Sequence, residues 1–387
     1  MLTTSASTIR CLQLGMSWFP EQAGNGLDRV YYALSSNLPK VGVSVHGLVA
    51  GTDAVQRSSE SRVMSFASDA AALPRRLLGL RTAVRRMLRT HPFDLVVSHF
   101  ALYTAPVLDL IDGLPLVVHF HGPWAGESKA EGESRLTTGA KAAVERLVYR
   151  RATKFIVLSD AFRCVLHEHY GIPYDFIRIV PGGTDTARFD VALSREEARM
   201  ALGWPTDRPI LLSVRRLAHR MGLENLIDAM EMVRRHVPGA LLLIAGKGPL
   251  KDDLNRRIAS LGLQETVKLL GFVPEENLPI AFRAAEFSVV PTVALEGFGL
   301  ITVESLAAGT PVLVTPNGGL PEVVRPLSCD LVLSGSGPHQ MADRIVSVLN
   351  GTVRLPSAPD CRRYVHEHFD WTRVARQTRS VYEEVLS

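Results

Sequence analysis

The feature that most constrains the fold is a regular alternation of short apolar runs with amphipathic segments along the whole chain. Runs such as 9–15 and 208–214 are rich in Val, Ile and Leu, and each precedes a segment with helical spacing of its apolar residues. Parallel strands buried on both faces have this composition, and successive parallel strands need a crossover that is usually a helix. The alternation therefore predicts α/β domains with doubly wound parallel sheets.

One interruption divides the alternation into two halves. The segment 181–189 (PGGTDTARF) contains a proline and two glycines, and the strand–helix pattern restarts after it. Because 387 residues are too many for one ordinary domain, we expect two Rossmann-like domains, 1–185 and 186–370, facing a central cleft. The helix predicted over 371–387 is expected to pack back on the first domain. We expect 51–72 to be a polar loop.

The stretch with the most candidate ligand-binding residues runs from Pro291 to Val324. It follows an apolar run that predicts a strand, and it places Glu296 in the next loop and Glu304 early in the next helix. Ionised carboxylates accept hydrogen bonds from hydroxyls, and the first amides of a helix, from about Gly299 to Ile301, favour an anion. A sugar nucleotide combines both features. The alternative is a helix that carries acidic residues near its start because its dipole favours them.

The segment 73–92 predicts an amphipathic helix of unusual charge. It has six arginines and no acidic residue, and Leu77, Leu80, Val84 and Leu88 form an apolar stripe. An ordinary surface helix explains the stripe. The other reading is a patch over 75–89 that contacts anionic lipid or an anionic acceptor. The net charge of +4 is compatible with both readings.

Cysteine usage and hydropathy bear on the compartment. The four cysteines are scattered, without a metal-ligand spacing, which indicates reduced thiols and no structural zinc. No run of 18 apolar residues and no signal-peptide core is present. We expect a cytoplasmic protein, with peripheral contact at the inner membrane left open. No Asp-x-Asp pair predicts a metal, and we expect no cofactor and no nucleic-acid partner.

The glycines after the first strand do not form a dinucleotide fingerprint. The sequence Gly24-Asn25-Gly26 lacks the third glycine of that motif and lies well past the strand. Five pieces in order nevertheless carry a family resemblance: this loop, HFHG at 119–122, VRRLAHRMG at 214–222, AGKGP at 245–249, and E-x7-E at 296–304 followed by GG-x-PE. The chain resembles the retaining glycosyltransferases of family 4, which have the two-domain architecture called GT-B.

The resemblance implies a nucleotide-sugar site. It implies that Glu296 binds sugar hydroxyls, that Glu304 binds the ribose and that His121 reaches the donor sugar. It implies metal-independent, retaining transfer of a hexosyl unit, with UDP-sugar favoured, to a glycan or lipid-linked acceptor in polysaccharide or glycolipid biosynthesis. The catalytic residues expected are His121, Glu296 and Arg216. The donor-binding residues expected are Gly24, Asn25, Gly26, Arg216, Arg220, Lys247, Val273, Gly299, Leu300, Ile301 and Glu304.

One departure concerns the cations. The family usually has a lysine where this chain has Met221, and a departing diphosphate needs positive charge. Arg215, Arg220 and Lys247 are the candidates to replace it, and adjacency favours Arg220. The departure keeps open the alternative of a non-catalytic sugar-nucleotide-binding protein. A sugar-nucleotide epimerase of the same fold is a second, separate alternative. His99 and His119 are expected to be ordinary polar residues.

Overall fold

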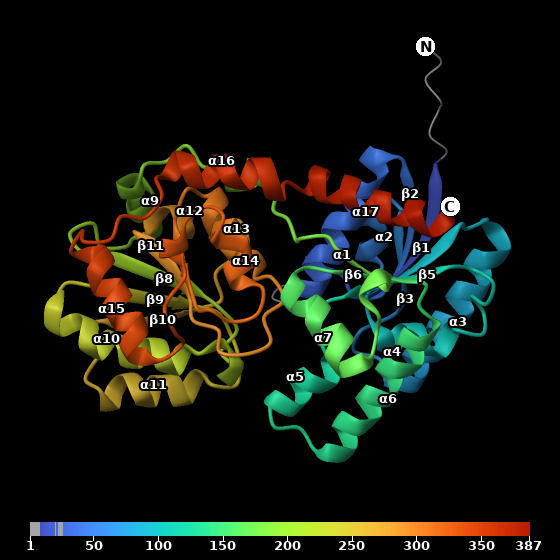
Figure 1. Ribbon diagram of the computed structural model, residues 1–387, viewed down its shortest axis with the longest axis horizontal. Helices are drawn as coiled ribbons and strands as arrows, with labels where there is room; N and C mark the ends of the chain where they lie inside the picture. The colour runs from blue at the N-terminus through green and yellow to red at the C-terminus, as the bar shows by residue number, and fades with distance from the viewer. Residues whose placement is uncertain (1–7, 20, 22–25) are drawn as a thin grey trace, which may run out of the picture. The chain divides into compact units, whose positions relative to one another are not determined.

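The computed structural model describes residues 8–19, 21 and 26–387, and it divides into two compact units (Figure 1). The first unit combines Met1–Gly182 with Trp371–Ser387, and the second is Gly183–Asp370. The first boundary therefore lies a few residues before the predicted one. A parallel bridge between Thr184 and Asp370, with Thr184 N–H donating to the Phe369 carbonyl at 2.8 Å, holds these residues in the second unit.

The first unit is built on a seven-stranded sheet in the order β3-β2-β1-β4-β5-β6-β7. Every pairing along it is parallel. The order reverses between β1 and β4, and ligands bind at such a switch point in open α/β sheets. The strands are β1 (Ile9–Ser17), β2 (Val43–Ala50), β3 (Val63–Ala67), β4 (Leu95–Ser98), β5 (Leu116–Phe120), β6 (Lys154–Val157) and β7 (Ile177–Ile179).

Helices cover both faces of this sheet (Figure 1). They are α1 (Gly26–Asn37), α2 (Ala54–Ser58), α3 (Leu73–Thr90), α4 (Ala101–Thr104), α5 (Trp124–Ala130), α6 (Arg135–Arg151), α7 (Asp160–Tyr170) and α17 (Trp371–Leu386). The polar loop predicted over 51–72 is wrong, because this segment contains α2 and the edge strand β3. Only Val63 of β3 is fully buried, so the strand lacks the apolar run that marks an inner strand.

Helix α17 is part of the first unit, although the whole second unit separates it from the rest of that unit in sequence (Figure 1, red). The Tyr382 ring is fully buried there. At the rim of the helix, Glu384 pairs with Lys154 Nζ at 2.7 Å and accepts from Arg178 Nε at 2.9 Å. These ion pairs join α17 to β6 and β7.

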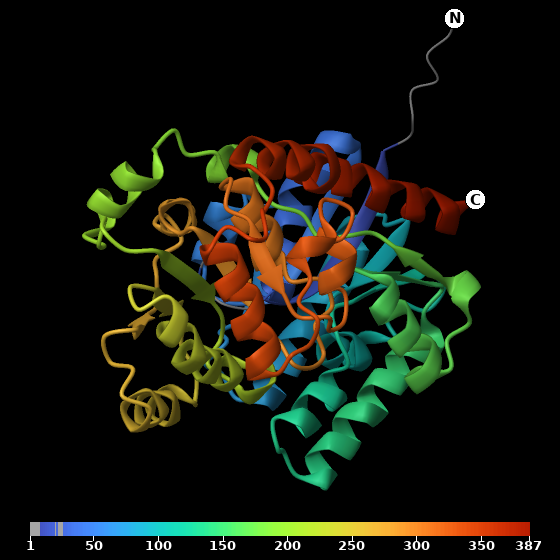
Figure 2. The same cartoon turned by 60° about the vertical axis from the view of Figure 1, so that its left-hand side comes forward.

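The second unit has a five-stranded parallel sheet in the order β10-β9-β8-β11-β12, which reverses between β8 and β11. Its strands are β8 (Ile210–Val214), β9 (Leu241–Ala245), β10 (Val267–Gly271), β11 (Phe287–Val290) and β12 (Val312–Val314). Its helices are α8 (Thr186–Phe189), α9 (Arg195–Leu202), α10 (Leu223–His236), α11 (Lys251–Ser260), α12 (Leu278–Ala284), α13 (Leu300–Ala307), α14 (Leu320–Val324), α15 (Pro338–Leu349) and α16 (Ala358–Phe369). Figure 2 shows α10 and α15 side by side over one face.

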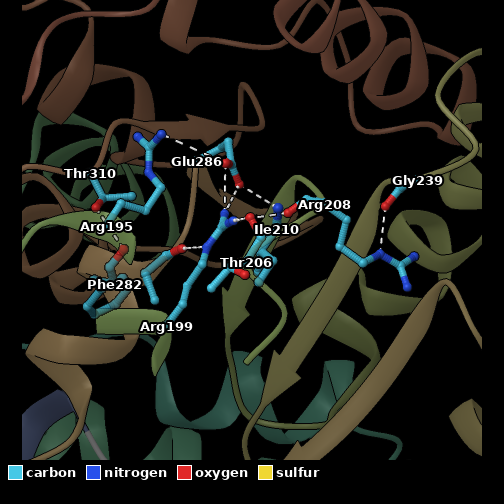
Figure 3. Close-up of polar contacts among 10 residues, drawn as sticks. Arg195, Arg199, Thr206, Arg208, Ile210, Gly239, Phe282, Glu286 and Thr310 are labelled. Atoms are coloured by element: carbon cyan, nitrogen blue, oxygen red, sulfur yellow. Dashed lines mark hydrogen bonds and ion pairs between the residues drawn. The ribbon is translucent and has the colours of Figure 1, made fainter. Parts of the chain in front are cut away.

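An ion pair between buried Arg199 and half-buried Glu286 fastens α9 to the amino ends of β8 and β11 (Figure 3). Arg199 Nη2 donates to both carboxylate oxygens of Glu286 at 2.8 and 2.7 Å, and its Nε donates to the Ala284 carbonyl at 2.9 Å. Glu286 also accepts from the Ile210 N–H. Because each charge has several hydrogen bonds, this pair meets the condition under which a buried ion pair is tolerated.

Candidate active site

The second unit has another Arg–Glu pair at the opposite, carboxyl ends of the same two strands. Arg215 is the first residue after β8, and its guanidinium donates to Glu296 and to the Thr292 hydroxyl, both from the loop after β11. The side chains of Arg215 and Glu296 are only 9% and 15% exposed. Arg215 Nε is buried and has no acceptor among the described residues. The pair therefore lies at the switch point and retains an unused donor.

The loop that carries Glu296 is held in a constrained conformation. Leu295 has a φ of +53°, which is uncommon for a residue with a side chain. Its carbonyl accepts from Arg220 Nη1 at 3.2 Å. Gly319 N–H donates to the Glu296 carbonyl at 2.9 Å, and a Cβ at Gly318 would overlap the same carbonyl. Close approach to the backbone of Glu296 thus explains the first glycine of the GG-x-PE motif.

The cations named from the sequence have distinct surroundings. Arg216 is exposed, and its guanidinium makes no hydrogen bond or ion pair with the described residues. Lys247 follows β9, and its Nζ lies 4.8 Å from the centroid of the Phe272 ring. Met221 is buried in the apolar core, at 6% exposure. Arg215 therefore contacts the Glu296 side chain, whereas Arg220 contacts the backbone of the preceding residue, Leu295.

The expected nucleotide-binding groups lie at the same edge of this sheet. Helix α13 begins after Gly299, whose φ is +76°, and the amides of Leu300 and Ile301 open its first turn. The next residue, Thr302, has a buried hydroxyl without a partner among the described residues, and no sequence pattern predicted it. Glu304 is buried at 6% exposure. Val273 lies just after β10 and is half-buried.

The first unit places three histidines at its own switch region. His121 follows β5, and the period of two along a strand puts His119 and His121 on one face and Phe120 on the other, in the core. His99 follows the neighbouring strand β4, where Ser98 pairs with Val118. Strand register therefore brings His99 beside both histidines. Gly26 is the first residue of α1, and the predicted Gly24 and Asn25 lie outside the described residues.

The three imidazoles form one packed group. His99 Nδ1 lies 3.0 Å from His121 Nε2, and the His99 and His119 rings stack at 4.4 Å between centroids. His119 Nε2 lies 3.2 Å from the Tyr382 hydroxyl of α17. Burial lowers the pKa of His121 to about 3 and lowers the pKa values of His99 and His119 well below their usual range. All three rings are therefore neutral at pH 7, and the prediction missed the contact between His99 and His121.

The described part of the chain contains neither a metal-binding cluster nor a membrane-spanning helix. Among its residues, no group of three or more His, Cys, Asp or Glu side chains could hold a metal ion. No helix there is both long and apolar enough to span a bilayer.

Comparison with known proteins identifies the family. The model for "Glycosyl transferases group 1" matches residues 194–367, and that for "Glycosyltransferase Family 4" matches residues 24–188. D-inositol 3-phosphate glycosyltransferase from Corynebacterium jeikeium is 30% identical over 310 residues, 76% of this chain and 73% of that protein. This chain belongs to glycosyltransferase family 4. The first match contains the site residues of this glycosyltransferase from Arg215 to Glu304.

Other relatives of this glycosyltransferase match over different shares of their length. The 2-deoxystreptamine glucosyltransferase of Streptomyces kanamyceticus is 27% identical over 379 residues, 91% of this chain and 97% of that one. An uncharacterized glycosyltransferase of Methanocaldococcus jannaschii is 31% identical over 62% of each chain. The structure of Anabaena HepE with UDP-glucose has a TM-score of 0.79 at 19% identity and covers 97% of this chain and 100% of HepE. This likeness shows that the glycosyltransferase has the GT-B fold.

Proposed function

We propose that this glycosyltransferase transfers a hexosyl unit, with retention and without a metal, from a nucleoside diphosphate sugar to a hydroxyl of a glycan or lipid-linked acceptor. The observation that carries the proposal is the Arg215–Glu296 pair at the switch point, beside exposed Arg216 and the first turn of α13. A carboxylate suits sugar hydroxyls, and cations with helix amides suit a diphosphate. A UDP-sugar is the first donor to test, since HepE of the same fold is solved with UDP-glucose.

The proposed mechanism is front-side displacement. The bond between the anomeric carbon and the phosphate oxygen breaks, the acceptor oxygen bonds to that carbon on the same face, and the leaving phosphate takes the acceptor's proton. Arg216 and the amides of Leu300 and Ile301 stabilise the negative charge of the leaving group. Glu296, oriented by Arg215, holds the sugar hydroxyls, Glu304 binds the ribose, and His121 orients the sugar.

Helix α3 carries exposed arginines that suit contact with a lipid-linked acceptor at a membrane. In α3, Arg76 donates to the Tyr103 hydroxyl at 2.6 Å and Arg81 pairs with Asp109 at 2.7 Å, so these two arginines fasten the helix. Four arginines stay exposed beside Leu78, which is 68% exposed: Arg75, Arg85, Arg86 and Arg89. We propose a cytoplasmic enzyme whose α3 contacts anionic lipid at the inner membrane and whose products enter polysaccharide or glycolipid biosynthesis.

A liposome experiment tests the membrane contact. The intact protein and a variant with Arg85→Gln and Arg89→Gln are sedimented with neutral vesicles and with vesicles that contain anionic phospholipid. We expect binding only to the anionic vesicles, weakened by salt and by the double substitution. Equal sedimentation with both kinds of vesicle would remove this part of the proposal and leave the transferase chemistry untouched.

A donor screen tests the transferase proposal itself. The protein is incubated with UDP-, GDP- and ADP-hexoses, with and without EDTA, and free sugar, nucleotide and sugar epimers are quantified. We expect slow release of hexose and nucleoside diphosphate that EDTA leaves unchanged, together with a rise in melting temperature for the preferred donor. A new epimer would favour the epimerase, and binding without turnover would favour a sugar-nucleotide sensor. If Glu296→Ala and Arg216→Ala both kept full activity, the assigned site would be wrong.

A further inference from the structure

We infer that His99 fixes His121 in the tautomer whose proton is on Nδ1, so that His121 presents an N–H donor to an oxygen atom of its ligand. His99 is then a positioning residue for His121. The identity of that oxygen, a hydroxyl of the donor sugar, rests on the proposed function, whereas the tautomer does not.

The geometry leaves His121 one nitrogen for a ligand. Its Nε2 lies 3.0 Å from His99 Nδ1, within normal hydrogen-bond distance, so one of these two nitrogens carries the shared proton. Its Nδ1 has no hydrogen-bond partner among the described residues. Both rings are neutral, so each carries one proton. The direction of the bond between His99 Nδ1 and His121 Nε2 therefore determines whether His121 Nδ1 is a donor or an acceptor.

The surroundings of His99 decide the direction of the bond. His99 is only 3% exposed, and its Nε2 is buried without a hydrogen-bond partner in the described chain. The ring is held between the stacked ring of His119 and the ring of Tyr31, whose centroid lies 5.1 Å away. If His121 donated, the neutral His99 would carry its own proton on Nε2, where a buried N–H would have no acceptor.

Buried N–H groups without an acceptor are rare and costly in folded proteins. The opposite arrangement avoids one: His99 holds its proton on Nδ1 and donates it to His121 Nε2, and His99 Nε2 carries only a lone pair. His121 must then hold its proton on Nδ1. Free imidazole side chains favour the Nε2 proton, so His121 is held in the tautomer that it would not adopt alone.

Nitrogen-15 NMR of the ligand-free protein tests the tautomer directly. The chain has 12 histidines, so a His121→Gln variant identifies the signals of His121 by their loss. We expect the His121 Nε2 shift of an unprotonated ring nitrogen and the Nδ1 shift of a protonated one between pH 6 and 8. A protonated Nε2 on His121 in the intact protein would overturn the inference.

Variants of His99 separate positioning from packing. Asparagine places an amide N–H near the position of Nδ1, so His99→Asn should keep the Nδ1-protonated form of His121, whereas His99→Phe should return it to the Nε2-protonated form. His119→Phe is the matched control, because it removes the stacked neighbour and leaves the His99–His121 bond. A switch of tautomer in His119→Phe without one in His99→Phe would contradict the role of His99.

Kinetics then test the link to the sugar. We expect His99→Phe to lower kcat/KM for the donor about tenfold, the value of one hydrogen bond, and His99→Asn to keep it within about threefold. If the tautomer switches but kcat/KM does not fall, the assignment of the ligand is overturned. If the intact protein transfers no sugar, the proposed function fails, while the NMR result still decides the tautomer.

Discussion

The switch points of the two sheets contain opposite kinds of polar group. In the first unit they are three neutral imidazoles, two of which stack, and His119 lies within hydrogen-bond distance of the Tyr382 hydroxyl. In the second unit they are full charges, with Arg215 and Glu296 paired and Arg216 exposed beside them. The carboxyl ends of the strands therefore carry a neutral histidine group in the first unit and a charged arginine–glutamate pair in the second.

The contrast follows from the cost of burying charge. An imidazole can lose its proton and enter the interior as a neutral group, whereas arginine keeps its charge and must be paired or solvated. Within the described part of the chain, the second unit contains both a fully bonded arginine and one with a free donor. At the amino ends of β8 and β11, Arg199 is buried and well bonded by Glu286 and carbonyl groups. At the carboxyl ends, Arg215 Nε has no acceptor among the described residues, as expected of a site that binds a ligand.

Breaking the Arg199–Glu286 pair at the amino ends should have the largest effect on stability. Arg199→Met removes a buried guanidinium and leaves the half-buried Glu286 carboxylate and the Ala284 carbonyl with fewer donors, and we expect the second unit to lose about 3 kcal/mol of unfolding free energy. Denaturant titration measures the loss. The double variant Arg199→Met, Glu286→Gln should lose less than the sum of the single variants. A loss below about 1 kcal/mol would mean that this pair is no more structural than a surface ion pair.

Removing charge at the carboxyl ends should act on turnover. We expect Arg216→Ala and Glu296→Ala to lower kcat about 10²–10³-fold, the cost of one group that stabilises the transition state. Arg216 is exposed, so its substitution should change the unfolding free energy by no more than about 0.5 kcal/mol. Arg208→Ala, at the amino end of β8, is the control for loss of an arginine elsewhere. Equal activity losses in both arginine variants would contradict the division between the two ends.

Acid should distinguish the neutral site from the charged one. The pKa values of His99 and His119 are below 6.5 in the folded state, so the unfolded chain binds more protons below pH 6.5 and stability falls as pH falls. Each group contributes up to about 1.4 kcal/mol per pH unit in this window. Chemical unfolding of the first unit between pH 7 and 5 measures the slope. A slope unchanged in His119→Phe would show that His119 is not neutral in the fold.

The smallest predicted effect is at Asp28, which has the opposite sign. Burial raises the pKa of Asp28 from 3.8 to about 6, so its protonated form favours the fold and this contribution is lost as pH rises through about 6. Asn keeps an acceptor for the Ser17 N–H, which donates to Asp28 at 3.0 Å. Asp28→Asn should therefore stabilise the protein by about 1 kcal/mol at pH 8 and have little effect at pH 4. Destabilisation at pH 8 would refute the pKa shift.

The sequence was sufficient for features with a strong local pattern. Inner parallel strands and long helices could be predicted because their apolar runs and spacings are distinctive, and the two sheets and the likeness to HepE confirm the fold class. The edge strand β3 was missed because it is buried on one face only. The contact of His99 with His121 could not be predicted, because it depends on the register of β4 and β5, which no local pattern encodes. The pairing of Arg215 with Glu296 likewise joins residues 81 apart.

Helix α17 has a consequence for biosynthesis. Tyr382 and Glu384 complete the first unit, but the ribosome must translate residues 183–370 before it reaches them. At translation rates of about 5–20 residues per second, the first unit waits roughly 10–40 s for its missing helix. During that interval the His119 side of the nascent sheet is uncovered, and the second unit, which is continuous in sequence, can fold first. Chaperone binding should therefore concentrate on the half of the protein that is made earliest.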